Sequence, residues 1–342
     1  MWCRAVAGLA DRVTLELVDR PPSSAGVKAD VWLADGHSGA LNVEEPVVAA
    51  IHEVGWTTRA LRSFLDPSFA CAFSARTTAG VLSAARVLTP SESSRRQVLD
   101  AYDVPAERVH TVPYGVDLGV FRPGLTGGRA GVGAMTATDD PPYVLFVATL
   151  HPRKNLAAVR QAVARLARRG FDHVLVLVAA DASDRDDSSE LRRAAEAELP
   201  AAPGRIVSVP TGEDSELAML MAGADAVCLP SFSEGFGLTA LEAMACGAPV
   251  IVSDRGALPE VVGGSGLIVP PTAEGVERAL VRIFSDAAFA AQLRGAARVR
   301  AEGFTWERMV GGWLNVLERA AAEAREPSVV GNVLRRAAAD VP

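Results

Sequence analysis

The chain has 342 residues, of which 49% are hydrophobic, and it carries a formal net charge of −7. This length predicts about two domains, with enough apolar residues for sizeable cores. The acidic balance argues against a general nucleic-acid-binding protein, so we expect no nucleic-acid partner. The four cysteines are scattered without a C-x-x-C pair, which argues against a zinc site and a disulfide framework and fits a reducing compartment.

The sequence offers no signal for membrane insertion. No apolar run reaches transmembrane length, and Met1-Trp-Cys-Arg lacks the hydrophobic stretch that follows in a signal peptide. We therefore expect a cytoplasmic protein, with at most peripheral contact at the inner face of the membrane. The basic clusters Arg95-Arg96 and Arg192-Arg193 are typical of solvated helix faces, although they could attract an acidic acceptor or an anionic lipid surface.

The first third of the chain is irregular but of α/β type. Strands are predicted at Val13–Val18, Asp30–Ala34, Pro46–His52 and Arg86–Thr89, and helices at Thr57–Leu65 and Ser91–Ala101. Ligands bind parallel sheets outside the carboxyl ends of the strands, where His52 falls. Taken alone, His52 could equally be a hydrogen-bonded strand terminus.

Beyond Pro142, continuous apolar segments alternate with helical ones. Strands are predicted at Tyr143–Ala148, His173–Ala180, Arg205–Val209, Ala224–Leu229 and Pro249–Ser253, and helices at Asn155–Arg169, Ser188–Leu199, Glu213–Ala222, Leu238–Cys246 and from about Thr272 to Arg325. Such alternation indicates a parallel, doubly wound sheet.

A glycine-rich stretch separates the two halves and ends in Asp139-Asp-Pro-Pro, a composition typical of a linker. We expect one Rossmann-like domain at residues 1–122, a linker at 123–142 and a second Rossmann-like domain at 143–315. Residues 316–342 would form a helical segment that could pack back on the N-terminal domain. The two domains would face each other across a cleft.

The segment Glu234-Gly-Phe-Gly-Leu-Thr-Ala-Leu-Glu242 opens a helix in the second half. First-turn N–H groups have no partner inside a helix and the dipole is positive there, so a phosphate is a natural ligand. Gly235 and Gly237 let the backbone approach a ligand closely. Glu234 and Glu242 can both point towards the cleft, which suits a nucleotide sugar. An ordinary strand–loop–helix unit with solvated glutamates is the alternative.

Other candidates carry weaker signals. Arg153-Lys154 follows a buried strand, which favours phosphate binding, although such a pair is usually solvated loop charge. Asp184-Arg-Asp186 has the D-x-D spacing of a metal site but lies in a polar loop, so we interpret it as surface. The remaining histidines are interpreted as structural, and only His37, in a small glycine-rich turn, could also face the cleft; they are His37, His110, His151 and His173.

Four segments resemble the family 4 (group 1) retaining glycosyltransferases of GT-B fold. The longest runs from Ser231 to Pro271, includes the Glu234 motif and Leu258-Pro-Glu260, and is most specific from Glu234 to Pro249. The others are the segment Val147–Leu156 with its Pro-Arg-Lys-Asn sequence, Ile51-His52-Glu53, and Val112-Pro-Tyr-Gly-Val-Asp117 with Phe121-Arg-Pro. The resemblance covers roughly Pro46 to Leu317.

The resemblance implies a role for each matching residue. Glu234 would bind hydroxyls of the donor sugar, Glu242 would accept hydrogen bonds from ribose, and His52 would contact the sugar from the opposite domain. Arg153 and Lys154 would neutralise the diphosphate. The remaining donor-binding residues, whose backbone amides would contact the sugar and diphosphate, are Gly235, Phe236, Gly237, Leu238 and Thr239.

The family implies a metal-independent enzyme without a cofactor, in which the N-terminal domain takes the acceptor and the second domain the nucleotide sugar. The donor would be GDP- or UDP-linked, with a lean towards GDP-mannose from the Pro-Arg-Lys-Asn sequence. The base would lie near Val209-Pro-Thr-Gly212. The acceptor, whether a glycan in polysaccharide biosynthesis, a lipid-linked sugar or a small molecule, is not specified by the sequence.

The chain also departs from the family pattern. The glycine-rich loop that follows the family's first strand is missing, so we expect a shortened N-terminal domain, through either a true start upstream or a truncation. Thr149 stands where many members have arginine, and Glu53 replaces the commoner aspartate. The missing loop motivates an alternative function, a degenerate, non-catalytic partner subunit that binds nucleotide. A nicotinamide-dependent oxidoreductase is disfavoured because no G-x-G-x-x-G follows a predicted strand.

Overall fold

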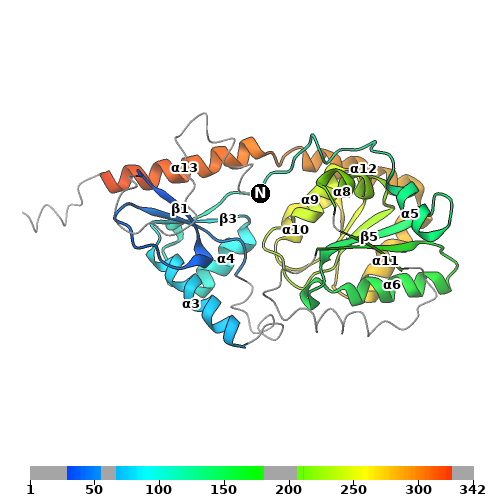
Figure 1. The fold of residues 1–342 in the computed structure, drawn as a ribbon, viewed down its shortest axis with the longest axis horizontal. Coiled ribbons are helices and arrows are strands. Elements are labelled where there is room, and N and C mark those ends of the chain that lie inside the picture. Colours follow the sequence, from blue (N-terminus) through cyan, green and yellow to red (C-terminus); the bar gives the residue numbers. More distant parts are fainter. Residues whose placement is uncertain (1–28, 55–66, 181–205, 211, 326–342) are drawn as a thin grey trace, which may run out of the picture.

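The computed structural model describes residues 29–54, 67–180, 206–210 and 212–325. Within these ranges the chain forms two parallel sheets with helices on both faces, set side by side along the long axis of the molecule (Figure 1). The predicted architecture of two doubly wound parallel-sheet units is therefore confirmed. No helix in the described ranges combines the length and apolar character needed to cross a membrane.

In the described part of the chain, the first sheet contains four parallel strands in the order β1-β2-β3-β4, formed by Trp32–Asp35, Val47–Ala50, Arg86–Thr89 and Val109–Thr111. Successive residues of a strand face opposite sides of the sheet. Val48, Ala50 and Leu88 accordingly join a core with Trp313 and Leu317 of α13 (Trp306–Arg325). The alternate residues pack with helices on the other face, which are α3 (Pro67–Ser83) and α4 (Glu92–Ala101).

The second sheet has, among the residues that are described, six parallel strands in the order β10-β9-β8-β5-β6-β7. Its strands are β5 (Tyr143–Thr149), β6 (Val174–Ala180), β7 (Ile206–Pro210), β8 (Ala226–Leu229), β9 (Val250–Ser253) and β10 (Leu267–Val269). Its helices are α5 (Gly128–Thr136), α6 (Leu156–Arg168), α8 (Asp214–Gly223), α9 (Leu238–Ala245), α10 (Leu258–Val262), α11 (Ala273–Ser285) and α12 (Ala287–Ala301). The strand order reverses at β5, between β6 and β8, and ligand crevices form at such switch points.

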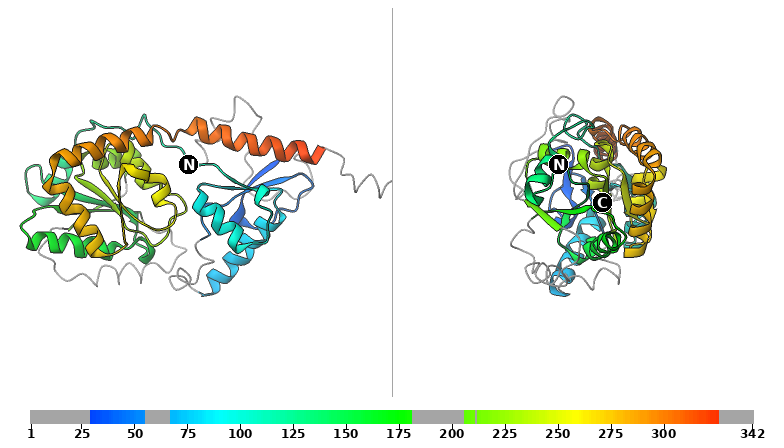
Figure 2. Two further views of the ribbon diagram at one scale, coloured as in Figure 1. Left: turned by 180° about the vertical axis from the view of Figure 1, so that it is seen from behind. Right: turned by 90° about the vertical axis from the view of Figure 1, so that its right-hand side faces the viewer.

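The chain crosses between the two sheets twice, and the two crossings touch. The amide of Val116 donates to the carbonyl of Phe304 at 3.0 Å. A side chain at Gly115 would lie 2.4 Å from the Trp306 nitrogen, so glycine allows this close approach. Beyond the second crossing α13 runs back along the first sheet, as the view from behind shows (Figure 2). Arg86 pairs there with Glu323, and Arg325 with Asp30.

The strands and helices predicted in the described ranges all form, with small shifts at their ends. Val13–Val18, Thr57–Leu65 and Ser188–Leu199 lie outside those ranges. The structure corrects the expectation of a linker at residues 123–142, because α5 lies within it and packs against α8. A side chain at Gly128 would lie 2.3 Å from the Met219 carbonyl oxygen. The glycines that suggested a linker thus serve, at this position, close helix packing.

Candidate nucleotide-sugar site

Glu234 lies buried in the loop between β8 and α9, and three side chains hold its carboxylate. Lys154 Nζ lies 2.6 Å from Oε1, the Ser231 hydroxyl donates to the same oxygen at 2.8 Å, and Arg153 Nη1 lies 3.4 Å from Oε2. Burial alone would raise the pKa of Glu234, but the charges of Lys154 and Arg153 outweigh burial and hold the pKa below its usual range. The carboxylate is therefore ionised near neutral pH.

The two cations lie in a short 3₁₀ turn, Pro152–Lys154, between β5 and α6. Asn155 follows in the left-handed conformation with φ of 58°. Its side-chain amide donates to the carbonyls of Pro230 at 3.0 Å and Pro271 at 2.9 Å, which fixes the turn against two neighbouring loops. The sequence thus places Arg153 and Lys154 rigidly at the carboxyl end of the central strand.

The N-terminus of α9 presents a row of unused backbone donors. Gly237 precedes the helix with φ of 105°, and no side chain caps this end. Within the described part of the chain, the N–H groups of residues 235 to 239 donate no hydrogen bond. The first intrahelical bonds begin at Ala240, whose amide donates to Gly237. These amides and the positive end of the helix dipole form a site suited to an anion.

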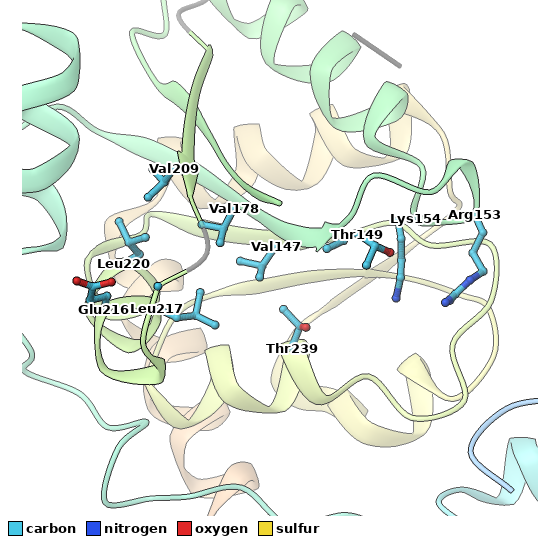
Figure 3. A pocket seen from close by; sticks show the side chains of 12 residues that line it. Val147, Thr149, Arg153, Lys154, Val178, Val209, Glu216, Leu217, Leu220 and Thr239 are labelled. Atoms are coloured by element: carbon cyan, nitrogen blue, oxygen red, sulfur yellow. The ribbon is translucent and has the colours of Figure 1, made fainter. Parts of the chain in front are cut away.

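A pocket of about 390 Å³ opens beside this helix end (Figure 3). Its apolar part is lined by Val147, Ala148, Val178, Val209, Leu217 and Leu220, and its polar part by Thr149, Arg153, Lys154, Gly212, Glu216 and Thr239. Glu216 lies at one end of the pocket and Arg153 with Lys154 at the other (Figure 3). An apolar slot between a carboxylate and two cations has the form needed for a base, a ribose and a diphosphate in that order.

His52 reaches the same loop from the first sheet. Its Nδ1 is hydrogen-bonded to the Tyr114 hydroxyl, and burial lowers the pKa of the ring, an effect that the charge of Asp35 partly offsets. The His52 carbonyl oxygen would lie 2.0 Å from a side chain at Gly235, so only glycine fits there. His37 lies beside it, with 6.4 Å between the ring centroids.

Glu53 belongs to the site, although the sequence indicated it only as a departure from the family pattern. Its carboxylate lies 3.6 Å from Arg153 Nη2 and accepts a hydrogen bond from the Ser233 hydroxyl at 3.1 Å. Burial raises the pKa of Glu53, and the charge of Arg153 only partly offsets this. Arg153 is thus shared between Glu53 from one sheet and Glu234 from the other. The available signal was the position of Glu53 directly after His52.

The predicted residues divide into two groups in the structure. Arg153, Lys154 and Thr239 line the pocket, with Glu234 paired to both cations. The side chain of Phe236 instead packs edge-on against Tyr114, with 5.1 Å between the ring centroids, so only its backbone is available to a ligand.

Glu242 does not line this pocket. Its carboxylate makes no hydrogen bond with another described residue, and burial, followed by the charge of Asp214, raises its pKa to about 7. The Asp184-Arg-Asp186 segment lies outside the described residues. Among the residues that are described, no group of three or more His, Cys, Asp or Glu side chains is arranged to hold a metal ion.

Comparison with known proteins agrees with this geometry. Residues 134–300 match the family described as glycosyl transferases group 1. The MMP alpha-(1->4)-mannosyltransferase of Mycolicibacterium hassiacum is 32% identical over 249 residues, 69% of this chain and 54% of the relative. A D-inositol 3-phosphate glycosyltransferase of Acidothermus cellulolyticus is 34% identical over 254 residues, 72% of this chain and 55% of the relative. The chain spans about half the length of these curated relatives.

Solved structures share the two-sheet architecture. Sucrose-phosphate synthase from Thermosynechococcus elongatus is 26% identical with a TM-score of 0.69, and the match covers 82% of this chain and 69% of that one. Anabaena HepE in complex with UDP and glucose is 19% identical with a TM-score of 0.66, covering 80% and 72%. The family match and the shared fold show that this chain belongs to the group 1 (family 4) glycosyltransferases of GT-B fold.

Proposed function

We propose that this protein is a retaining glycosyltransferase that moves a hexose from a nucleoside-diphosphate sugar to a hydroxyl acceptor. The observation that carries the proposal is the convergence of Lys154, Arg153 and the unused amides of residues 235 to 239 at one end of an apolar pocket. This combination suits a ligand with two phosphates attached to a flat, weakly polar group. The relatives named for sugar transfer support the same reading.

The proposed pose follows from the chemistry of the lining. The base occupies the slot between Val178, Val209 and Leu217, and the diphosphate lies over the N-terminus of α9 beside Lys154. The sugar extends towards Glu234 and the His52 loop. A carboxylate offers about four acceptor positions. Three contacts already hold Glu234, so a sugar hydroxyl adds one hydrogen bond to it or replaces the long contact with Arg153.

The reaction breaks the bond between the anomeric carbon and the diphosphate oxygen. As this bond lengthens, negative charge grows on the leaving diphosphate, and Lys154, Arg153 and the amides stabilise it. Stabilisation of this kind is usually the largest single contribution to catalysis. The acceptor oxygen attacks the same face, its proton passes to the departing phosphate oxygen, and the new glycosidic bond keeps the anomeric configuration. No protein side chain has to remove the proton.

For the donor we propose a guanosine-diphosphate hexose, with mannose as the sugar. Guanine presents two adjacent N–H donors at its Watson–Crick edge, which one carboxylate accepts together, whereas uracil presents two carbonyl oxygens flanking a single N–H. Glu216 supplies a carboxylate at the end of the slot. A relative named as a mannosyltransferase supports the choice of sugar. The relatives named for D-inositol 3-phosphate make that compound the first acceptor to test.

The test combines calorimetry with a transfer assay. GDP-mannose, GDP-glucose and UDP-glucose are titrated into the protein and then incubated with D-inositol 3-phosphate and other hydroxyl acceptors. Nuclear magnetic resonance of the product gives the anomeric configuration. Tight binding with transfer and an α-linked product is expected. Binding without transfer or donor hydrolysis under any condition would favour the non-catalytic partner, and an inverted product would contradict the retaining mechanism.

A further inference from the structure

Two serines at the start of α4, Ser91 and Ser94, bind the backbone of the loop between β8 and α9, which we call the donor loop. Helix α4 packs on the first sheet, and the two together belong to what we call the first sheet's unit. The Ser91 hydroxyl donates to the Gly235 carbonyl at 2.7 Å, and the Ser94 hydroxyl donates to the same oxygen at 2.9 Å. Both serines are fully buried. Ser91 also caps α4 by accepting a hydrogen bond from the Ser94 amide at 2.9 Å. The start of α4 therefore binds one specific carbonyl of a loop more than 140 residues away in the sequence.

The same end of α4 is bound by a carboxylate of the second sheet's unit. Glu260 of α10 accepts hydrogen bonds from the amides of Glu92 at 2.9 Å and Ser93 at 3.2 Å. A carboxylate at a helix N-terminus is favoured by the helix dipole. The loop before α10 also supports Glu234, because the Ala257 amide donates to the Glu234 carbonyl at 3.0 Å. Four hydrogen bonds thus seat α4 on the elements that carry Glu234.

Because the peptide group between Gly235 and Phe236 is planar, binding its carbonyl also fixes the direction of its N–H. In a trans peptide the carbonyl of Gly235 and the N–H of Phe236 point in opposite directions. Because two hydroxyls bind the carbonyl, the Phe236 N–H is aimed away from α4. The His52 carbonyl, packed against Gly235, leaves the peptide little room to turn. The orientation of this donor is therefore set by residues of the other sheet.

We propose that Ser91 and Ser94 are positioning residues for the transfer reaction, which aim the amides of the donor loop at the leaving diphosphate when α4 docks on that loop. The inference rests on the proposed function. It also makes the donor site dependent on the first sheet's unit, since the loop acquires its full hydrogen bonding only when the two units are in contact.

Ser94→Ala provides the test, because the Ser94 hydroxyl binds only Gly235 among the described residues and alanine is a good helix former. Ser93→Ala is the matched control, since Ser93 directly precedes Ser94, is also buried and does not bind Gly235. We expect Ser94→Ala to lower kcat about tenfold or more, as a misplaced catalytic group does. The dissociation constant of GMP stays within about twofold, because the base and ribose contacts lie elsewhere in the pocket. Ser91→Gly/Ser94→Ala, which keeps most of the capping, should lower kcat further.

Hydrogen exchange of the amides that donate to carbonyls of this loop, those of Ala240 and Leu241 to Gly237 and that of Ala257 to Glu234, supplies a readout that does not depend on activity. Faster exchange of these amides in Ser94→Ala than in Ser93→Ala is expected, because the loop loses a hydrogen bond. Wild-type-like exchange in Ser94→Ala would overturn the positioning role even if no transfer were found. Equal kcat for Ser94→Ala and wild type, in an active protein, would overturn it as well. An inactive wild type with faster exchange in Ser94→Ala would count against the proposed function and leave the loop contact established.

Discussion

Lys154 Nζ lies 2.6 Å from Glu234 Oε1, and this contact joins the loop that follows β5 to the loop that follows β8. The pair is largely shielded from solvent, with the two side chains 17% and 10% exposed. Each charge therefore depends on the other for its stability in the folded protein. Lys154 is thus already oriented, and its charge partly compensated, in the protein without a ligand.

A double-mutant cycle measures this dependence. Lys154→Met leaves the buried Glu234 carboxylate with Arg153 as its remaining cation, so we expect a loss of about 1–3 kcal/mol in the free energy of unfolding. Glu234→Gln should cost a similar amount, and the double variant less than the sum, because it leaves neither charge unpaired. Urea unfolding gives these values. Additive losses would mean that the contact contributes nothing to stability.

Catalysis should respond differently from stability in the same three variants. Lys154→Met should lower kcat by about 10²–10³-fold, the range found when one donor to a developing oxyanion is removed. The double variant should remain equally slow, although its stability recovers. A double variant that regained wild-type kcat would show that Lys154 acts only as a partner of Glu234.

Glu242 should make stability depend on pH. Burial raises its pKa to about 7 in the folded protein from an ordinary value of 4.5. The folded state then holds the proton more tightly than the unfolded state. Its contribution is therefore fully present below the ordinary value and is lost as the pH rises towards 7. In Glu242→Gln the melting temperature should fall less between pH 5 and pH 7.5 than in wild type. An identical profile would contradict a raised pKa.

The same carboxylate offers a test of ribose binding. Ribose hydroxyls donate hydrogen bonds most strongly to an ionised carboxylate, so binding GDP-mannose should release a proton from Glu242 near pH 6.5. GDP-mannose itself has no group that titrates there. Calorimetry in two buffers of different ionisation enthalpy measures the released proton, which Glu242→Gln should abolish. If no proton were released, Glu242, which lies outside the described pocket, would have a structural role and would not bind ribose.

Glu216 should select the base. Glu216→Gln replaces an acceptor pair by one acceptor and one donor, so we expect GDP affinity to fall by about 1–3 kcal/mol. UDP affinity should change by less than about twofold, because uracil gains little from the carboxylate. Glu213→Gln is the matched control, since Glu213 directly precedes α8, the helix that contains Glu216, but does not line the pocket. A selective loss in Glu213→Gln instead would assign the base contact to that residue.

Gly235 should tolerate no side chain. A methyl group there would lie 2.0 Å from the His52 carbonyl oxygen, which is backbone and cannot move aside cheaply. We expect Gly235→Ala to lower donor affinity and kcat by about tenfold or more, because the loop must shift. Gly264→Ala, at a position with open space around it, is the control. Donor titrations and initial rates check both variants, and equal behaviour would contradict the tight contact.

A side chain at Gly115 should lower the stability of the folded protein. A methyl group there would lie 2.4 Å from the Trp306 nitrogen, where the two crossings touch. Overpacking of this kind costs about 1–3 kcal/mol, so Gly115→Ala should lower the free energy of unfolding by that amount. Gly311→Ala lies in α13 with open space around it and should stabilise the helix by about 0.5–1 kcal/mol. Thermal and urea unfolding distinguish the two signs.

Much of the fold was predictable because it depends on local patterns. Continuous apolar segments of four to seven residues became β2, β6 and β8, and Ser91, the predicted start of a helix, is the N-cap of α4. Elements with weak local signals were missed. The helix α3 lacks a pronounced apolar face, and α5 is rich in glycine, which is the poorest helix former after proline. Packing against neighbouring elements stabilises α5 instead.

The candidate site likewise combines features that depend on local sequence with contacts that only the folded chain makes. The sequence by itself determined the positive-φ glycine before α9, the uncapped helix end and the basic turn after β5, since each depends on residues within one short segment. Tertiary structure decided which groups meet. Lys154 and Glu234 are 80 residues apart, Ser91 and Gly235 are 144 apart, and Ser233 and Glu53 are 180 apart. Short-range propensities act over a few residues, so the pairing of β5 with β8 brings Lys154 to Glu234, and the packing of the two sheets brings the other two pairs together.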